Sequence, residues 1–537
     1  FLSSTLYAQT PRRYWVKLTD KASTPYSISS PEDFLATQSI NRRIKQGISV
    51  DSRDLPVDPN YVSQLASVPT VTIWHKSKWF NAVSVEVADS TQVDSIFNLP
   101  FVVDVDTVKW IPVDLETEFA EKHVGHTNFH HEYYGGAFKQ IEMLNGHFLH
   151  SLGYQGNGMT IAVMDAGFDQ VDQIPVFSNL MSEGRVVATK DMVDGNSYVY
   201  NAHQHGTAVL SCMAAELEGI MVGTAPAANY ILIRTEDGGS ESRVEEDNWI
   251  AAAEYADSIG ADIFNTSLGY TTFDDSTMNY TYADMDGNTA RISVAADVAA
   301  SRGILVITSA GNMGSSSWNY ISAPADADSS LAVAAVDSFL VRAGFSSFGP
   351  ASDGDLKPNV AAMGKRTMCA FPNGDIRTAN GTSFSAPVLS GMAACLWQAL
   401  PNKTNMEIKA LIEDHGNQNL TPDTSLGYGV PNFYEAYLEG IGASKSFEDE
   451  VLTVFPTLFE DRINIHFHSQ SPGFWHLKIL NSIGQLMLES EIEVENEQYV
   501  QTVFTDEIEN LTSGSYIIHL YKDGILYARE KAIKIKD

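Results

Sequence analysis

The chain has 537 residues, of which 44% are hydrophobic, and its 67 acidic against 34 basic side chains give a formal charge of −33 at pH 7. That length is typical of three or four domains, and the hydrophobic content excludes a wholly disordered chain. The negative charge disfavours binding to nucleic acid and to anionic membranes. Beyond the first few residues no apolar run is long enough to span a bilayer, so we expect no membrane span.

The N-terminal region begins with a short apolar segment, residues 1–9, which is typical of the end of a secretory signal peptide; a strand is the alternative. Residues 10–111 follow the order β-α-β-β-α-β, with a polar stretch after the first strand. That order predicts a ferredoxin-like α+β domain. The predicted strands are 14–18, 71–75, 82–87 and 102–105, and the helices lie near 61–66 and 91–97.

A His-rich segment follows at residues 112–134. It contains His123, His126, His130 and His131, which as a group would suit a metal site. No cysteine or carboxylate ligand framework accompanies these histidines, so we interpret the segment as a linker and assign no metal ligand.

The three cysteines are Cys212, Cys369 and Cys395, and they are too few and too widely spaced for a disulfide framework or a metal site. Cys212 and Cys395 lie in Ala-rich apolar runs, which is typical of small buried residues. A disulfide between one pair stays open if the protein is exported.

Residues 135–444 alternate between apolar strands and long Ala-rich helical stretches. The strands lack polar residues at alternate positions, which predicts an α/β domain with a mostly parallel sheet and helices on both faces. A region of about 300 residues can bury one large core. The predicted strands are 160–164, 230–233, 263–266 and 304–307, and the predicted helices include 247–258, 290–300 and 386–400.

Residues 445–537 have a different pattern. Segments 462–468, 475–479 and parts of 516–521 alternate apolar and polar residues with a period of two, and Gly-containing turn signals separate them. This pattern predicts a small antiparallel β-sandwich.

Four polar residues of the α/β region lie where a strand ends or a helix begins. Asp165 ends an apolar strand, at the sheet edge where α/β proteins bind ligands. His205 and Ser383 each open an apolar helix, and Asn312 lies in a loop after a strand. The glycine directly after His205 would leave space beside the imidazole. Any one of the four residues alone is equally typical of a structural cap. Together they supply the carboxylate, base and nucleophile of a catalytic triad and an amide donor for an oxyanion.

The segment Asn380-Gly-Thr-Ser-Phe-Ser-Ala-Pro387 contains two serines. Residues two apart on a helix point about 200° apart, so only one serine can face an imidazole. Ser383 lies at the helix start, where its own N–H has no helical partner and is free to meet an oxyanion. We therefore predict that Ser383 is the nucleophile and that Ser385 packs or bonds locally.

In the chain order Asp165, His205, Asn312, Ser383 these motifs resemble the subtilisin-like serine peptidases, or subtilases. The resemblance implies a secreted serine endopeptidase with the subtilisin-like α/β fold and no cofactor for catalysis. No Gly-x-Ser-x-Gly motif of an α/β-hydrolase esterase occurs in the chain. The stretches that carry the resemblance are His205-Gly-Thr207, Ala225-Pro226, Thr266-Ser-Leu-Gly269, Ser309-Ala-Gly-Asn312 and Gly381-Thr-Ser-Phe-Ser-Ala-Pro387.

The same resemblance implies a substrate-binding groove with two walls. One wall hydrogen-bonds the substrate backbone, and the other borders the specificity pocket. Their residues are Ser267, Leu268 and Gly269 on the first wall and Ser309, Ala310 and Gly311 on the second.

The flanking domains also resemble known modules. Residues 10–111 are similar to the propeptide that assists folding of subtilases and inhibits them until it is cut off, here in or near 112–135. Residues 445–537 resemble the sorting domain of the Por-type (type IX) secretion system, through Val454-Phe-Pro456, Leu511–Tyr516 and Ala532–Ile535. The implied partners are peptide substrates, the chain's own propeptide and the secretion machinery. The implied location is extracellular or cell-surface, reached through the periplasm of a Gram-negative bacterium.

Several alternatives stay open at this point. A catalytically silent subtilase scaffold would serve adhesion or binding, and the same triad would serve a peptide ligase. The acidic loop 274–288 resembles part of a calcium loop but lacks the closing glutamate, so a solvated acidic insertion is the alternative to structural calcium. Five acidic residues between 236 and 246 predict either a cleft for basic residues or a generally acidic surface.

Overall fold

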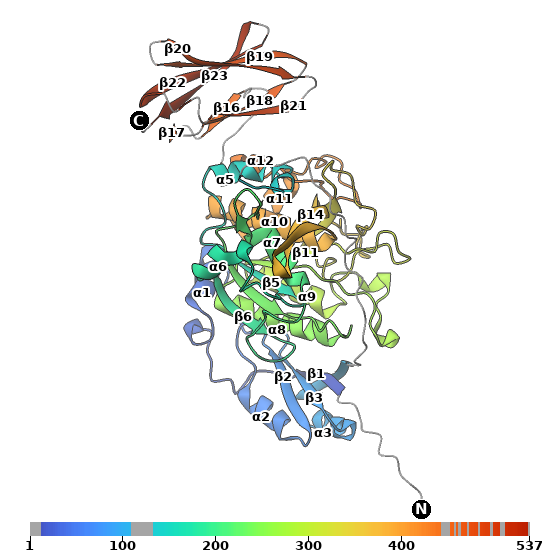
Figure 1. Ribbon diagram of the computed structural model, residues 1–537. Coiled ribbons are helices and arrows are strands. Elements are labelled where there is room, and N and C mark those ends of the chain that lie inside the picture. The colour runs from blue at the N-terminus through green and yellow to red at the C-terminus, as the bar shows by residue number, and fades with distance from the viewer. Residues whose placement is uncertain are drawn as a thin grey trace, which may run out of the picture. The chain divides into compact units, whose positions relative to one another are not determined.

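The computed structural model describes residues 12–108, 133–441 and the strands and most turns from 452 to 534 (Figure 1). The signal-peptide segment and the four histidines of the predicted linker lie outside these described residues. The gaps after 452 are 456–457, 460–462, 470–471, 482–483, 495–497, 505–507, 509–510 and 523. The chain forms two compact units, Phe1–Gly146 with Gln155–Ala436, and His147–Tyr154 with Tyr437–Asp537.

The N-terminal domain is a four-stranded antiparallel sheet in the order β2-β3-β1-β4. Its core joins strand residues such as Val16 and Val83 to Leu65 of a helix on one face. The predicted ferredoxin-like order is therefore confirmed. The strands are β1 (Arg12–Leu18), β2 (Val71–Ser77), β3 (Ala82–Val87) and β4 (Val102–Val108), with helices α2 (Pro59–Ser67) and α3 (Val93–Phe97).

One helix of this domain escapes the sequence pattern. The stretch after β1, predicted only as polar, contains the turn η1 (Pro31–Asp33) and the helix α1 (Thr37–Lys45). The inward face of α1 carries Arg42 and Arg43 in place of an apolar stripe, and both are buried. A rule that identifies helices by periodic apolar residues cannot detect such a face.

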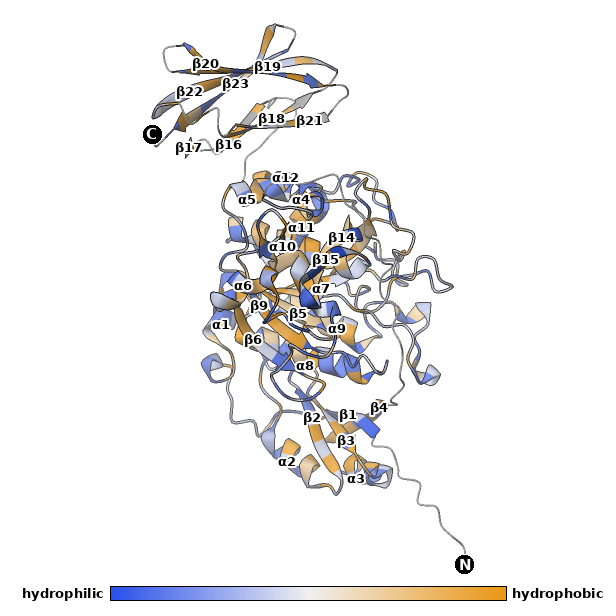
Figure 2. Ribbon diagram, in the orientation of Figure 1, coloured by the Kyte–Doolittle hydropathy of each residue, from blue (hydrophilic) through white to orange (hydrophobic). Residues whose placement is uncertain are grey.

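The α/β region is built on a seven-stranded parallel sheet in the order β13-β12-β11-β10-β5-β9-β6. Its central strands are almost wholly apolar and buried, and Figure 2 shows them as a hydrophobic centre. This confirms the predicted parallel sheet. The strands are β5 (Thr160–Asp165), β6 (Val186–Asp191), β9 (Asn229–Arg234), β10 (Ile263–Thr266), β11 (Leu305–Ser309), β12 (Leu331–Val336) and β13 (Val360–Met363).

Four helices cover the two faces of this sheet. The helices α7 (His205–Ala214) and α10 (Thr382–Ala399) pack together, while α8 (Val244–Ile259) and α9 (Arg291–Ser301) pack together against alternate residues of the same strands. The helix α7 begins with His205, the predicted base, and the second residue of α10 is Ser383, the predicted nucleophile. The N-terminal sheet packs on α8 and α9, where Trp15, Trp79 and Val108 join their core.

The C-terminal domain is a β-sandwich with a core centred on Trp475. Its pairs are antiparallel as predicted, except that the two-residue strand β17 (Leu458–Phe459) runs parallel to β23. The sheets are β16-β18-β21 and β17-β23-β22-β19-β20. The other strands are β16 (Leu452–Phe455), β18 (Ile463–Ser469), β19 (Gly473–Asn481), β20 (Leu486–Val494), β21 (Gln498–Phe504), β22 (Gly514–Lys522) and β23 (Ile525–Lys534).

Of the helices that the structure describes, none is both long and apolar enough to cross a membrane.

Candidate active site

The carboxyl edge of the parallel sheet gathers the predicted site residues. The strands β5, β10 and β11 are neighbours in the sheet and all point the same way. Asp165 is the last residue of β5, Ser267 directly follows β10, and Ala310 directly follows β11. Residues that are far apart in sequence therefore meet at one edge, as expected for a ligand site of an α/β fold.

Asp165 and His205 form a hydrogen-bonded pair. Nδ1 of His205 lies 2.8 Å from Oδ1 of Asp165, and Asp165 is only 1% exposed. The same carboxylate oxygen accepts a bond of 2.8 Å from the N–H of Ala166, which fixes its orientation. Gly206 lets the start of α7 come this close, because a Cβ there would lie 2.3 Å from the carbonyl oxygen of Gly167. The glycine after the histidine thus makes room for the Asp165 loop rather than beside the imidazole.

The surroundings of His205 favour its protonated form. Burial lowers the pKa of His205, but the charge of Asp165, their hydrogen bond and the nearby Glu236 together raise it, and the net pKa lies above the ordinary value of 6.5. An imidazole with a raised pKa, bonded at Nδ1 to a carboxylate, is a stronger base at its other nitrogen.

Ser383 lies in the first turn of α10 and is half-buried, whereas Ser385 is fully buried. The Oγ atom of Ser267 donates to the backbone carbonyl of Ser383 at 2.9 Å, and the ring of the next residue, Phe384, lies 5.9 Å from the ring of His205. Ser385 donates its hydroxyl to the carbonyl of Thr382 at 2.9 Å. Of the two serines, only Ser383 is partly exposed.

Asn312 is held with its amide oxygen turned toward the start of α10. Its Oδ1 accepts bonds of 2.9 Å from both the N–H and the hydroxyl of Thr382. Because both partners donate, the oxygen of the amide is identified, and the NH₂ group is the donor that lies next to Gly381. Thr382 also accepts a bond from the N–H of Gly311, so one threonine links the loop after β11 to the helix start.

The segments 267–269 and 309–311, the two predicted walls of the groove, are joined by hydrogen bonds. The hydroxyl of Ser309 donates to the carbonyl of Leu268 at 3.3 Å, and Ser267 is bonded to Ser383 as described above. Gly269 leads into Tyr270, whose backbone pairs with that of Ala323. The segments 267–269 and 309–311 are therefore neighbours at the same edge.

Comparison with known proteins decides the family. The profile of the Subtilase family matches residues 156–429, which is about half of the chain. The chain belongs to the subtilase family. Residues 13–123 match the Peptidase S8 propeptide domain of Bacteroidota, and residues 453–535 match a secretion system C-terminal sorting domain. The protein is thus a subtilisin-like serine endopeptidase with a propeptide domain and a type IX sorting domain.

Individual relatives agree with this assignment. The chain is 31% identical to Subtilisin NAT of Bacillus subtilis subsp. natto over 317 residues, which are 58% of this chain and 73% of the relative. It is also 31% identical over 317 residues to Subtilisin E of Bacillus subtilis (strain 168), with the same coverage. It is 32% identical to Subtilisin of Bacillus pumilus over 278 residues, which are 51% of this chain and 89% of the relative.

Two residues have a place near the candidate triad that the sequence did not predict. Thr382 orients Asn312, and its position directly before the predicted nucleophile could have identified it from the sequence. Glu236 accepts from the hydroxyls of Tyr270 and Thr235 at 2.6 and 2.8 Å. Burial raises the pKa of Glu236 to about 7, and its charge interacts with both Asp165 and His205. No local pattern marks the position of this glutamate, because Tyr270, Asp165 and His205 are far from it in sequence.

The acidic residues between 236 and 246 do not form a generally acidic surface. Glu245 is 2% exposed and accepts from the N–H groups of Asp237 and Ser242 at 3.0 and 2.9 Å, so it holds its own loop together. Glu246 is fully buried and accepts from Tyr280 at 2.7 Å. For these two, the interpretation as solvated surface is wrong, because they serve internal hydrogen bonds.

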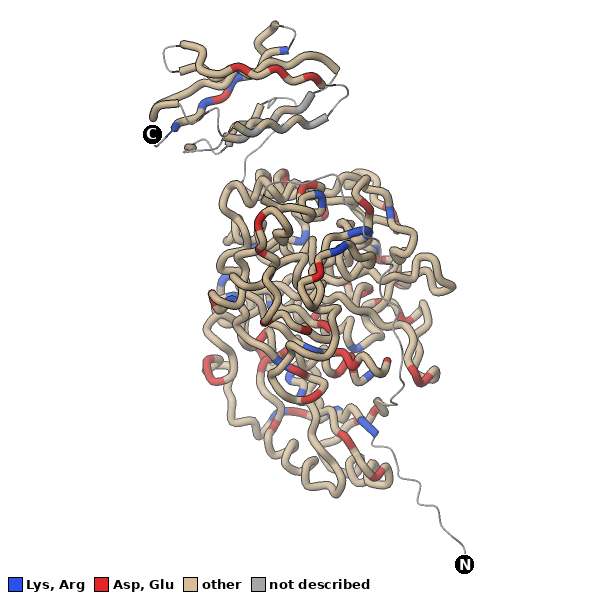
Figure 3. Tube along the Cα trace, in the orientation of Figure 1, with Lys and Arg blue, Asp and Glu red and all other residues tan. Residues whose placement is uncertain are grey.

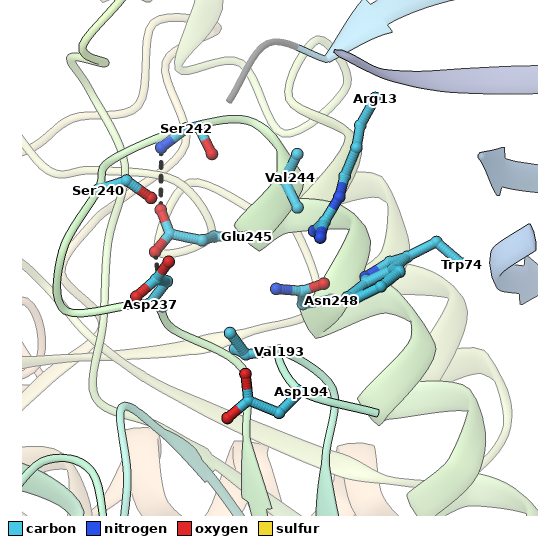
Figure 4. Close-up of a pocket in the computed structure, with 10 residues that line it drawn as sticks. All are labelled: Arg13, Trp74, Val193, Asp194, Asp237, Ser240, Ser242, Val244, Glu245 and Asn248. Atoms are coloured by element: carbon cyan, nitrogen blue, oxygen red, sulfur yellow. Dashed lines mark hydrogen bonds between the residues drawn. The ribbon is translucent and has the colours of Figure 1, made fainter. Parts of the chain in front are cut away.

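A cavity of about 280 Å³ lies beside this loop (Figure 4). Arg13 and Trp74 of the propeptide domain form one side of it, and the loop before α8 forms the other. None of the candidate catalytic residues lines it. The cavity is a gap in the contact between propeptide and subtilase domain, and it does not belong to the active site.

Two carboxylates of the acidic loop 274–288 accept hydrogen bonds from residues of the same loop. Asp284 caps a short helix by accepting from the N–H and hydroxyl of Thr281 at 2.7 Å each, and Asp286 accepts from the N–H groups of Asn288 and Thr289 at 2.9 and 2.7 Å. Within the described ranges, no group of three or more His, Cys, Asp or Glu residues could hold a metal ion. Both carboxylates thus have hydrogen-bond partners within their own loop.

The three cysteines are buried thiols, and none of them forms a disulfide. The sulfur atoms of Cys212 on α7 and Cys369 lie 3.7 Å apart, and Cys395 lies against the carbonyl of Thr224 at 3.2 Å. Burial raises the pKa of the Cys369 thiol well above its ordinary value, so this thiol stays protonated. This agrees with the interpretation of the cysteines as small buried residues.

Proposed function

We propose that this protein hydrolyses peptide bonds through an acyl-enzyme formed on Ser383. His205 takes the proton of the Ser383 hydroxyl as general base and then gives it to the leaving amine, while Asp165 orients the imidazole and stabilises its charged form. The observation that carries this proposal is the buried 2.8 Å bond between Asp165 and His205, at the sheet edge that also holds the half-buried Ser383.

The same proposal assigns the oxyanion hole and the groove. The Asn312 amide and the N–H of Ser383 would donate to the oxyanion. Asn312 is bonded to Thr382 at the start of α10, and an N–H in the first turn of a helix has no partner within the helix. The segments 267–269 and 309–311 would bind the substrate on either side. The mechanism needs no cofactor, since base, nucleophile and oxyanion donors all come from the chain.

We further propose a domain division for maturation. Residues 10–111 act as folding helper and inhibitor, 112–134 contain or border the cleavage site, 135–444 form the peptidase, and 445–537 direct export and are then dispensable. The chain would reach the secretion machinery through the periplasm. The matches to a propeptide domain and a sorting domain support this division.

A fluorophosphonate probe tests the assignment of the nucleophile. Protein freed of its propeptide should be labelled, and the Ser383→Ala protein should not, because the probe reacts with an activated serine. Absence of labelling in the wild type would favour the silent scaffold. Casein digested in the presence of a competing amine separates hydrolase from ligase, since a ligase would transfer the acyl group to the amine.

The pH profile tests His205 as base. Since the neutral imidazole takes the proton, kcat/KM should fall tenfold per pH unit below the pKa of His205, and this pKa lies above 6.5. We expect full activity above that pKa and a steady loss as the pH falls through it. The measurement is kcat/KM for a neutral peptide between pH 4 and 10. A rate unchanged down to pH 4 would exclude His205 from this role.

A further inference from the structure

The segment that contains α1 joins the propeptide domain to the subtilase domain through a contact separate from that of the propeptide sheet. We call residues 31–58, between β1 and α2, the strap. The propeptide sheet already contacts α8 and α9 through apolar residues such as Trp15 and Trp79. The strap makes a second contact of a different kind, with charged residues, at the C-terminal ends of the same two helices.

The guanidinium of Arg42 meets three acceptors of the subtilase domain. Its Nε donates to the carbonyl of Arg302 at 3.1 Å, one terminal nitrogen donates to the carbonyl of Ala261, and the other donates to the carboxylate of Asp257 at 2.5 Å. Arg42 is 5% exposed and Asp257 is fully buried. Only a planar fork of donors can reach three acceptors in this arrangement, so the set selects a guanidinium over an ammonium group.

Asp257 is neutralised entirely by the propeptide domain. Besides Arg42, its carboxylate accepts from Arg43 at 3.0 Å and from Lys78 at 2.8 Å. Burial raises the pKa of Asp257, but the three cations lower it by more, so that the net pKa lies well below the usual range. The carboxylate therefore keeps its charge in mildly acidic solution, and acidification does not loosen this contact.

A second set of ion pairs has the opposite arrangement, with the cation on the subtilase domain and the carboxylates on the strap. Arg302 of the subtilase domain is 2% exposed and pairs with Asp51 at 3.1 Å and with Asp54 at 3.4 Å, both in the strap. Asp54 in turn pairs with Arg43 at 2.7 Å. Figure 3 shows acidic and basic positions intermixed where the N-terminal region meets the α/β domain.

The subtilase backbone is shaped to receive the strap. The N–H of Ala36 donates to the carbonyl of Ser258 at 2.8 Å, next to the end of α8. Gly260 terminates α8 with φ of 103°, and a Cβ there would lie 2.4 Å from the Cβ of Gln38. Carbonyl groups at a helix C-terminus carry partial negative charge, which attracts cations. Carboxylate, carbonyls and glycine thus form one binding site on the subtilase domain.

We propose that the strap is a second docking element of the propeptide, and that the peptidase binds it through a guanidinium site built from Asp257 and the carbonyls of Ala261 and Arg302. The proposal rests on the proposed role of residues 10–111 as an inhibitor. In this scheme the strap keeps the propeptide bound after the connecting chain is cut, and the propeptide leaves only when the strap itself is degraded.

The test uses the full chain with Ser383→Ala and a recognition sequence for an unrelated site-specific protease inserted within residues 112–134. After cutting, the dissociation constant of the two parts is measured by size-exclusion chromatography and native mass spectrometry over a dilution series. The strap variant is Arg42→Ala with Arg43→Ala. The matched control is Lys45→Ala with Arg53→Ala, which removes two exposed positive charges from the same segment.

We expect the strap variant to raise the dissociation constant by about 100-fold or more, because it leaves Asp257 buried without its arginines. The control should stay within about threefold, as exposed charges contribute little. Equal dissociation constants for parent and strap variant would overturn the proposal. Since every sample lacks the Ser383 hydroxyl, the result does not depend on whether Ser383 is the nucleophile.

A conservative variant covers the case in which the double variant does not fold. Arg42→Lys keeps the charge but cannot reach all three acceptors, and it should raise the dissociation constant by about tenfold. Hydrogen exchange of residues 257–261 in the uncut chain gives a second readout, and it should be faster in Arg42→Lys than in the parent. An unchanged dissociation constant together with unchanged exchange would refute the guanidinium site.

Discussion

Ser383→Ala is expected to lower kcat for peptide hydrolysis on the order of 10⁶-fold, the loss known from subtilisin when its nucleophile is removed. The reason is that Ser385, the other serine of this segment, cannot take its place. The hydroxyl of Ser385 is fully buried and donates to the carbonyl of Thr382. The rate is measured with a chromogenic peptide on protein whose propeptide was removed by an inserted protease site, because the variant cannot process itself.

Ser385→Ala is the matched control for this experiment. It removes the same atom two residues away, and it should leave kcat within a few-fold while lowering the free energy of unfolding by about 1 kcal/mol for the lost hydrogen bond. Substantial turnover by Ser383→Ala, or a comparable loss in Ser385→Ala, would contradict the assignment of the nucleophile.

The sequence was sufficient to predict the parts of this molecule that depend on local patterns. The strands of the parallel sheet are apolar runs without alternation, and a sheet buried on both faces requires such runs. Asp165 ends such a strand, and His205 and Ser383 lie at the starts of apolar helices, so a local pattern marks each of them. Glycine next to His205 also marked a close approach, although the neighbour it accommodates is the Asp165 loop.

Features that depend on long-range partners were not predictable in this way. The helix α1 has two arginines where an amphipathic helix has apolar residues, and these arginines are stabilised by Asp257, more than 200 positions away along the chain. Glu245 and Glu246 are residue types expected on a solvated surface, yet both are buried. A backbone N–H group donates to Glu245, and the hydroxyl of Tyr280 donates to Glu246. A charged residue reveals its burial only through its partners, and those partners belong to other elements.

The largest effect after the loss of the nucleophile is expected for Asp165→Asn, which should lower kcat about 10⁴-fold. An amide at this position has no charge to stabilise the imidazolium that forms when His205 takes the proton. An isosteric amide keeps the oxygen that accepts the bonds from His205 and from the N–H of Ala166. We expect the variant to fold with a melting temperature close to that of the wild type.

The acid limb of the pH profile gives this prediction a second readout. In the wild type, Asp165 is the main cause that raises the pKa of His205, while burial lowers it. Removing the charge leaves burial dominant, so the residual activity of Asp165→Asn should decline at a lower pH than that of the wild type. Asp172→Asn is the control, since it neutralises an exposed carboxylate in the loop after the same strand and should change neither kcat nor the acid limb. If Asp165→Asn lowered kcat by less than tenfold, Asp165 would be excluded as the partner that sets the basicity of His205. The same would follow if its activity declined at the same pH as that of the wild type.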